Sequence, residues 1–118
     1  MSHRKQFIWQ KAVALSVSCY KLTNLFPKSE LYGLTSQIRR CSVSIPSNIA
    51  EGYGRVSTKE YLRFLQIANG SLRELDTQLL IAQKIEIADR KAIEQVLLEV
   101  EEVQRILTSS LKKLGSKG

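Results

Sequence analysis

Apolar residues recur at intervals of three and four along almost the whole chain, the spacing that places side chains on one face of an α-helix. The longest stripe follows Ser57-Thr58-Lys59-Glu60, a capping box that satisfies the free amides at a helix start. It predicts a helix of about 28 residues, roughly 42 Å long. No segment alternates in the manner of a half-buried strand, so the chain is expected to be all-α. The stripe consists of Tyr61, Leu65, Ala68, Leu72, Leu75, Leu79 and Ala82.

Three further stripes predict three further helices. The first helix should end at Pro27, which has no backbone N–H and restricts the residue before it. The second contains Pro46, which removes the backbone bond to the carbonyl of Ser42 and is expected to kink the helix. The last should begin after Asp89 as N-cap and end at Gly115. The stripes are Ile8, Ala12, Leu15, Cys19, Leu22 and Phe26; Leu34, Ile38, Cys41, Ile45, Asn48 and Gly52; and Ile93, Leu97, Val100, Leu107, Leu111 and Leu114.

Four amphipathic helices joined by short connections predict an antiparallel up-down-up-down four-helix bundle. With 118 residues, the chain is long enough for one core and is expected to form a single domain over residues 1–118. Gly52 and Gly54 are interpreted as the exit of the second helix, where glycine tolerates positive φ.

The net charge of +7 is confined to the first part of the chain. Through Arg63 there are ten Lys and Arg against three Asp and Glu, whereas the rest has eight of each. Such asymmetry favours a polyanionic partner, although it is also compatible with a merely solvated surface. Two basic groups are therefore predicted to bind phosphates of RNA or DNA. They are Arg4, Lys5 and Lys11 before and on the first helix, and Arg55, Lys59 and Arg63 around the start of the third.

Apolar residues surround most of the third helix near its start, between Tyr61 and Ala68. A single bundle covers only one side of such a helix, so the second apolar side predicts a contact between copies of the chain. The expected homo-oligomer interface consists of Phe64, Ile67, Ser71, Gln78 and Ile81.

Asn48 interrupts an apolar stripe, and an unpaired buried amide costs on the order of 1–3 kcal/mol. A structural polar network is therefore predicted around it. Glu51 and Glu74 could instead form a carboxylate pair for acid–base chemistry, for example in a nuclease. No nucleophile, set of metal ligands or phosphate-binding loop accompanies them, so the protein is expected not to be an enzyme. The network residues are Arg39, Arg40, Asn48, Glu51, Ser71 and Glu74.

Cys19 and Cys41 lie on apolar stripes and are interpreted as buried hydrophobic residues. Two cysteines and one histidine are too few for a structural zinc site, and no cofactor is expected. No apolar run approaches the length of a membrane span, and the N-terminus does not resemble a signal peptide. The protein is therefore expected in the cytoplasm.

Four motifs stand out along the chain: Gln37-Ile38-Arg39-Arg40, Asn48-Ile49-Ala50-Glu51-Gly52, Ser57 to Tyr61, and Gly70-Ser71-Leu72-Arg73-Glu74-Leu75. They resemble those of the bacterial four-helix-bundle proteins encoded by intervening sequences within 23S ribosomal RNA genes. The resemblance implies an antiparallel bundle that assembles as a homopentamer. It also points to a relative, the accessory variability determinant of diversity-generating retroelements, which works with a reverse transcriptase and nucleic acid.

Two functional hypotheses follow. The first is a non-enzymatic, oligomeric bundle that binds RNA or DNA through a basic surface in a sequence-independent manner. The alternative is a protein-interaction scaffold or accessory factor, as in the retroelement-associated relatives, without direct binding of nucleic acid.

Overall fold

The computed structural model describes residues 2–117 and contains four α-helices and two short 3₁₀ turns. Residues 2–117 contain no strand, which confirms the predicted all-α class. None of the described helices is both long and apolar enough to cross a membrane. The elements are η1 (His3–Lys5), α1 (Phe7–Thr23), η2 (Lys28–Glu30), α2 (Leu34–Tyr53), α3 (Thr58–Lys84) and α4 (Arg90–Lys117).

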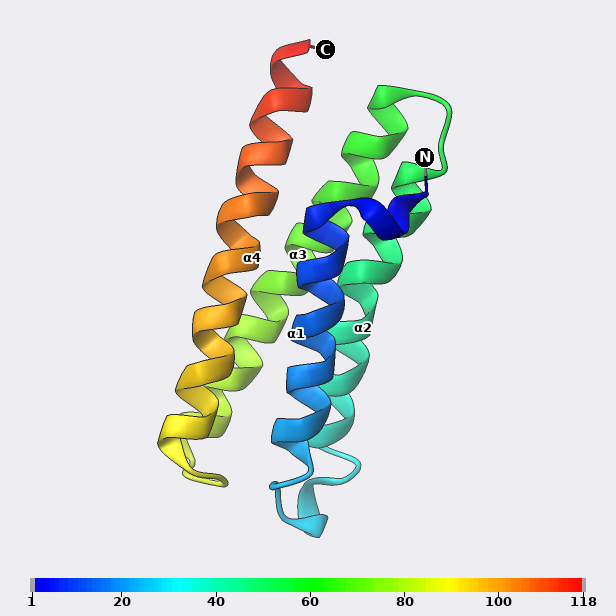
Figure 1. The fold of residues 1–118 in the computed structure, drawn as a ribbon. Coiled ribbons are helices and arrows are strands. Elements are labelled where there is room, and N and C mark those ends of the chain that lie inside the picture. The colour runs from blue at the N-terminus through cyan, green and yellow to red at the C-terminus, as the bar shows by residue number, and fades with distance from the viewer. Residues whose placement is uncertain (1, 118) are drawn as a thin grey trace.

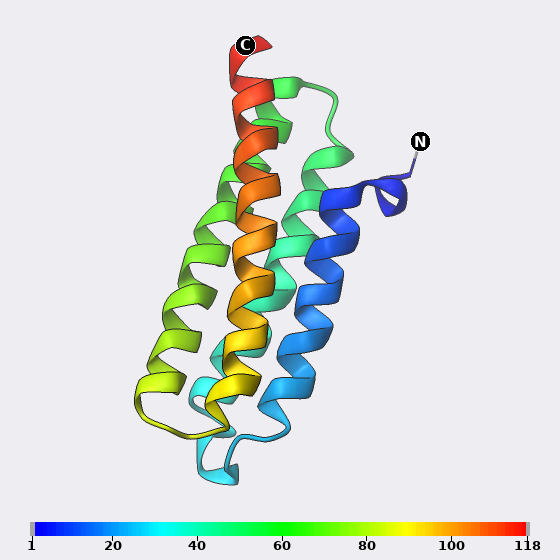
Figure 2. The same ribbon diagram turned by 60° about the vertical axis from the view of Figure 1, so that its left-hand side comes forward.

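The helices form a rod of 45 × 20 × 20 Å in which consecutive helices run in opposite directions (Figures 1 and 2). The start of α1, the α2–α3 loop and the end of α4 lie at one end, which we call the terminal end. Each helix packs against two neighbours, in the order α1, α2, α3, α4 and back to α1. The α1–α2 side of the rod is therefore opposite its α3–α4 side.

The predicted stripes form most of the core, which also includes Ile49, Val96 and Val103. Some residues of the stripes are only partly buried and pack against it: Leu34, Leu97, Leu111 and Leu114. On α3 the six residues from Leu65 to Ala82 in the stripe are all buried, and Tyr61 packs against their edge. The helix has 27 residues, close to the expected length. It begins directly after Ser57, whose Oγ accepts a hydrogen bond from the backbone N–H of Glu60 at 3.1 Å. The capping signal in the sequence therefore places the start of α3 correctly.

Two predicted helix ends are wrong. Helix α1 ends at Thr23, before Pro27, and Phe26 is buried in the turn that follows. The Thr23 hydroxyl donates to the Cys19 carbonyl at 2.8 Å, the common bond of a threonine to the backbone one turn earlier. Helix α4 continues through Gly115 to Lys117, because a glycine costs a helix only about 1 kcal/mol and does not by itself terminate it.

Pro46 lies inside α2 and leaves the carbonyl of Ser42 without its usual helical donor. The Ser16 hydroxyl of α1 donates to this carbonyl at 2.7 Å, and the bond is buried. A defect inside one helix is thus converted into a polar contact between α1 and α2.

We expect Ser16→Ala to lower the free energy of unfolding by about 1–3 kcal/mol, because it leaves the Ser42 carbonyl buried without a donor. Pro46→Ala restores a backbone N–H to that carbonyl. The cost of Ser16→Ala should therefore shrink in the Pro46→Ala background, as urea unfolding of the two single variants and the double variant would measure. Equal costs in both backgrounds would contradict this account of the contact.

Candidate nucleic-acid interface

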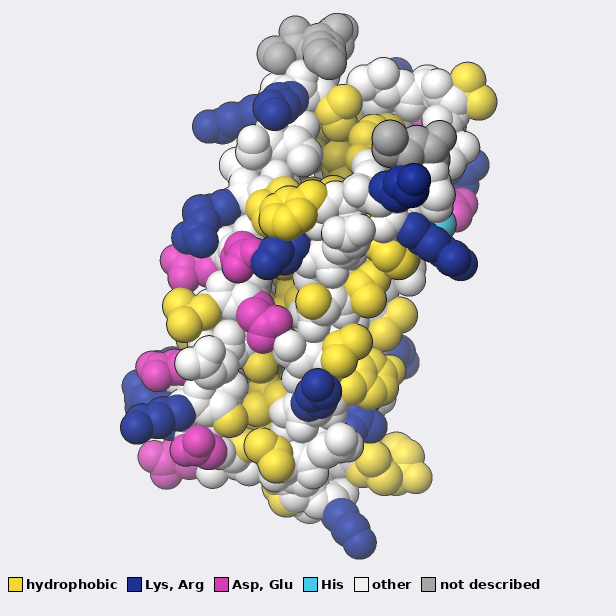
Figure 3. Space-filling view, viewed as in Figure 1, with side chains coloured by type: hydrophobic (Ala, Val, Ile, Leu, Met, Phe, Trp, Pro, Cys, Tyr) yellow, Lys and Arg dark blue, Asp and Glu magenta, His cyan; other side chains and the backbone are white. Residues whose placement is uncertain are grey.

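The elements that carry five of the six predicted basic residues lie at the terminal end of the bundle. Arg4 and Lys5 belong to η1, just before α1, and Arg55 lies in the loop that leads to α3. Lys59 and Arg63 lie in the first turns of α3. All five side chains are exposed, and dark blue side chains flank this end in Figure 3. We call this group of five residues the basic end.

The N-terminal turn is held in place by polar contacts. The Gln6 side chain donates from Nε2 to the hydroxyl of Tyr61 on α3 at 2.7 Å. Gln10 donates from Nε2 to the carbonyl of Arg4 at 2.9 Å. These bonds attach η1 to both α1 and α3, and they place Arg4 at the same end as the basic residues of α3.

Arg55 and Arg63 both lie against the ring of Phe64. Their guanidinium carbons are 4.9 and 5.5 Å from the ring centroid, within the range of cation–π attraction. Arg55 is also paired with Glu51 one helical turn earlier. The structure therefore orders two cations around Phe64, a residue that the sequence pattern assigns to an oligomer interface.

Lys11 stands apart from the basic end. Its Nζ is 2.6 Å from Oε1 of Glu102 on α4, and it lies 5.5 Å from the centroid of the Phe7 ring. The ion pair joins α1 to α4, whereas the ion pair of Arg55 stays within its own end of α2. This residue is better described as a link between helices than as a phosphate ligand.

Sequence reasoning missed the contribution of α4 to this surface. Lys112 and Lys113 are exposed near the end of α4, which lies at the terminal end. Their spacing in the sequence indicates only that they complement the helix dipole. The number of helices was a usable signal, because in a bundle with alternating directions the start of the first helix and the end of the fourth share one end.

The predicted pairing of Asn48 with Glu51, Ser71 or Glu74 is wrong. The Asn48 side chain donates from Nδ2 to the carbonyl of Ser44, at 2.7 Å, within its own helix. Short polar side chains within helices commonly form a hydrogen bond with the backbone carbonyl one turn earlier. Asn48 therefore needs no partner on a neighbouring helix.

Arg39 faces α1 and not the other residues of the predicted network. Its Nε donates to the hydroxyl of Thr23 at 2.8 Å, and its Nη2 donates to Oδ1 of Asn24 at 2.9 Å. The guanidinium carbon lies 4.9 Å from the centroid of the Tyr20 ring. Arg39 thus fixes the end of α1 against the start of α2.

Arg40 and Glu74 line one hollow of about 380 Å³ between α2 and α3, together with Gln37, Cys41 and Gln78. The Cys41 thiol donates to the backbone carbonyl of Ser71 at 2.9 Å and thereby links the two helices. The structure therefore divides the predicted network into separate places: the α1 side of α2, this hollow, and the terminal end with Glu51.

The two carboxylates considered for catalysis are far apart. Glu74 lines the hollow beside Cys41, whereas Glu51 is paired with Arg55 near the end of α2. Ten residues of helix separate positions 41 and 51, or about 15 Å at 1.5 Å per residue. Carboxylate pairs that act on one bond lie within roughly 5–10 Å of each other. The structure does not bring these two groups together.

Both cysteines are buried, as predicted. Burial, with a smaller contribution from Glu99, raises the pKa of the Cys19 thiol to about 12. Burial, with a smaller contribution from Glu74, raises the pKa of the Cys41 thiol to about 11. Neither thiol forms the reactive thiolate at neutral pH, which is the behaviour of packing residues.

The predicted interface residues lie along the α2–α3 side of α3. Ile67 and Ile81 are 40% and 45% exposed, and Gln78 is partly buried. Oε1 of Gln78 is buried without a hydrogen-bond partner within the described part of the chain. Ile67 and Ile81 are about four turns apart on α3, so they do not form one continuous exposed apolar surface.

The comparisons with known proteins agree with this architecture. The family model described as 23S rRNA-intervening sequence protein matches residues 4–109. A solved structure, titled as a protein with unknown function from the S23 ribosomal protein family of Bacteroides thetaiotaomicron VPI-5482, is similar with a TM-score of 0.79. The two chains are 25% identical, and the similarity covers 89% of this chain and 98% of that one. No curated protein gives a significant match. The chain belongs to the 23S rRNA-intervening sequence protein family.

Proposed function

We propose that the protein is a non-enzymatic, self-assembling four-helix bundle that binds the phosphates of RNA or DNA in the cytoplasm through its basic end. The observation that carries this proposal is the convergence of five exposed basic side chains from η1, the α2–α3 loop and α3 on one end of the rod. Phosphate binding by Lys and Arg requires this kind of clustered positive charge and no particular base sequence.

Two further features suit a phosphate ligand. Arg55 and Arg63 are ordered against Phe64, so less side-chain entropy is lost when they bind. Helix α3 begins at the same end, and its N-terminal amides add partial positive charge. The separation of Glu51 from Glu74 supports a binding role without hydrolysis of the bound strand.

Self-assembly would repeat the basic end and make weak phosphate contacts act together. The family resemblance implies a homopentamer, and we adopt that number as part of the proposal. A ring of five copies would place five basic ends on a single nucleic acid. Binding would then depend on assembly as well as on individual Lys and Arg residues.

A salt titration tests the role of the basic end. We expect the triple variant Arg55→Ala, Lys59→Ala, Arg63→Ala to bind a single-stranded RNA more weakly. The slope of log K against log salt should become shallower by about 0.7 for each phosphate that a protomer no longer neutralises. Fluorescence anisotropy at several salt concentrations measures both quantities, and circular dichroism checks that the helix content is unchanged.

The matched control removes the same charge from the opposite end of the rod, with Lys84→Ala, Arg90→Ala and Lys91→Ala, all at exposed positions. This variant should keep most of the affinity and the slope. Equal losses in the two triple variants would show attraction by net charge alone and contradict a localised interface. If the wild type bound neither RNA nor DNA at low salt, the proposal would fail and the alternative of a protein-interaction scaffold would stand.

A further inference from the structure

An apolar groove of about 310 Å³ runs between α1 and α2. Val17, Tyr20 and Val43 line it and are 47%, 43% and 41% exposed. The only charged side chain that lines the groove is Lys21, and the guanidinium of Arg39 lies over the Tyr20 ring. Helix α1 contains no Asp or Glu. The groove is therefore apolar with a positive border.

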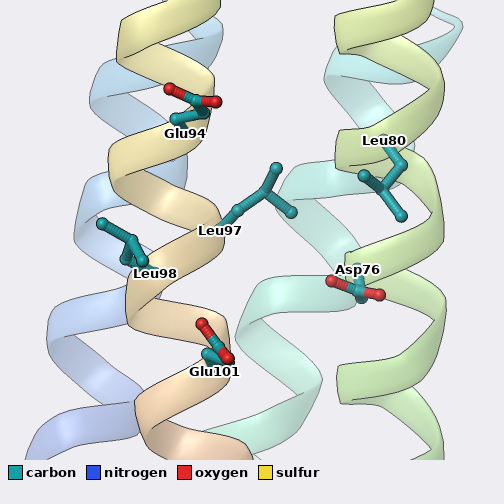
Figure 4. Close-up of a pocket in the computed structure, with 6 residues that line it drawn as sticks. All are labelled: Asp76, Leu80, Glu94, Leu97, Leu98 and Glu101. Atoms are coloured by element: carbon teal, nitrogen blue, oxygen red, sulfur yellow. The ribbon is translucent and has the colours of Figure 1, made fainter.

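A second groove, of about 410 Å³, runs between α3 and α4 (Figure 4). Leu80 and Leu98 line it and are 39% and 59% exposed. Asp76 on α3 and Glu94 and Glu101 on α4 border these leucines.

None of those three carboxylates has an ion-pair partner among the side chains of residues 2–115. Between Lys91 and Arg105, helix α4 carries four Glu and no basic residue. Figure 3 shows magenta side chains over α4 and yellow side chains along the α1–α2 side of the same molecule. The second groove is therefore apolar with a negative border.

We propose that the α1–α2 groove of one copy packs against the α3–α4 groove of a second copy. The two grooves lie on opposite sides of the rod, since the helices follow one another around the bundle in the order α1, α2, α3, α4. The contact would cover the exposed apolar side chains of both grooves. It would also place Lys21 and Arg39 opposite the carboxylates of the α3–α4 groove, which otherwise lack a partner. This inference rests on the proposed self-assembly and assigns its contact surface.

Charge argues against a symmetric contact, in which the same groove of both copies would face itself. Two α1–α2 grooves facing each other would bring Lys21 and Arg39 of both copies together. Two α3–α4 grooves facing each other would bring six carboxylates together. Like charges that face each other across a contact repel, which disfavours association of the two copies. The contact is therefore heterologous, with a different surface on each copy, and such contacts either close into a ring or extend into a filament.

Two variants that each block one groove test this inference. The first carries Val17→Asp and Lys21→Glu in the α1–α2 groove, and the second carries Glu94→Lys and Leu98→Lys in the α3–α4 groove. All four positions are exposed, so the fold should persist, which circular dichroism checks. Each variant alone should sediment as a 13.4 kDa monomer at micromolar concentration. Mixed in equal amounts, they should associate at least into a dimer, because the intact α3–α4 groove of the first variant fits the intact α1–α2 groove of the second.

The matched control is Ile67→Ser with Ile81→Ser on the α2–α3 side, which should assemble like the wild type. Dissociation of this control would move the contact to the α2–α3 side and overturn the inference. Wild-type-like assembly of both groove variants, or two monomeric variants that form no dimer when mixed, would overturn it as well. A wild type that is monomeric under the same conditions would instead refute self-assembly itself, and with it this contact.

Discussion

Leu72→Ala should lower the free energy of unfolding by about 2–5 kcal/mol, the range found when a large apolar side chain is deleted from a packed core. Leu72 is completely buried in α3, which packs between α2 and α4, so the space left behind has rigid walls on several sides. A domain of this size is stable by only about 5–15 kcal/mol. The variant should therefore lose a large part of its stability.

Urea unfolding followed by circular dichroism measures this effect. Wild type and variant must be compared at one protein concentration, because self-association raises apparent stability. The control is Leu25→Ala in the turn after α1, where the side chain is 61% exposed and the change should stay within about 0.5 kcal/mol. A cost below about 1 kcal/mol for Leu72→Ala would show that α3 is not central to the core.

Gly52→Ala should lower the free energy of unfolding by about 1–3 kcal/mol, because the added methyl group overpacks the contact between α2 and α3. A Cβ at this buried position would lie 2.7 Å from Cβ of Phe64 and 3.0 Å from Cδ1 of Tyr61. The Phe64 Cβ is attached directly to the backbone of α3, so relief requires α2 and α3 to separate. Because Phe64 also supports Arg55 and Arg63, the same variant should weaken binding of RNA at low salt.

Gly70→Ala provides the opposite result. Gly70 lies within α3, and a Cβ there would meet no atom within 4 Å. Alanine is a better helix former than glycine, so this variant should gain about 0.5–1 kcal/mol. Thermal unfolding of both variants tests the pair. If both variants were destabilised to a similar extent, the cost of Gly52→Ala could not be assigned to the specific contact with Phe64 and Tyr61.

Gly52 also shows where a local interpretation of the sequence fails. The sequence favours a positive φ at the exit of the second helix. No described glycine has a positive φ, and α2 continues past Gly52 to Tyr53. The absence of a side chain matters there because α3 passes close by. Spacing within one helix carries no information about the distance to the next.

The sequence predicted the residues of the basic end but not their arrangement. The two groups around Arg4 and around Arg55 were both predicted, but nothing in their spacing shows that they meet. Their presence at one end depends on the alternating directions of the helices, which place η1 at the same end of the rod as the start of α3. Lys11 was predicted as a phosphate ligand, but folding pairs it with another residue. Its Nζ lies 2.6 Å from Oε1 of Glu102, which is far from it in the sequence.

By itself, the sequence determined the four helices, the start of α3 at Ser57 and most residues of the core, because periodicity and capping act within a few residues of one another. The tertiary structure decided which polar groups meet: Ser16 with the Ser42 carbonyl, and Arg55 and Arg63 with Phe64. It also decided that an acidic and a basic groove lie on opposite sides. These features depend on how the helices are rotated and set against one another, which no single stripe specifies.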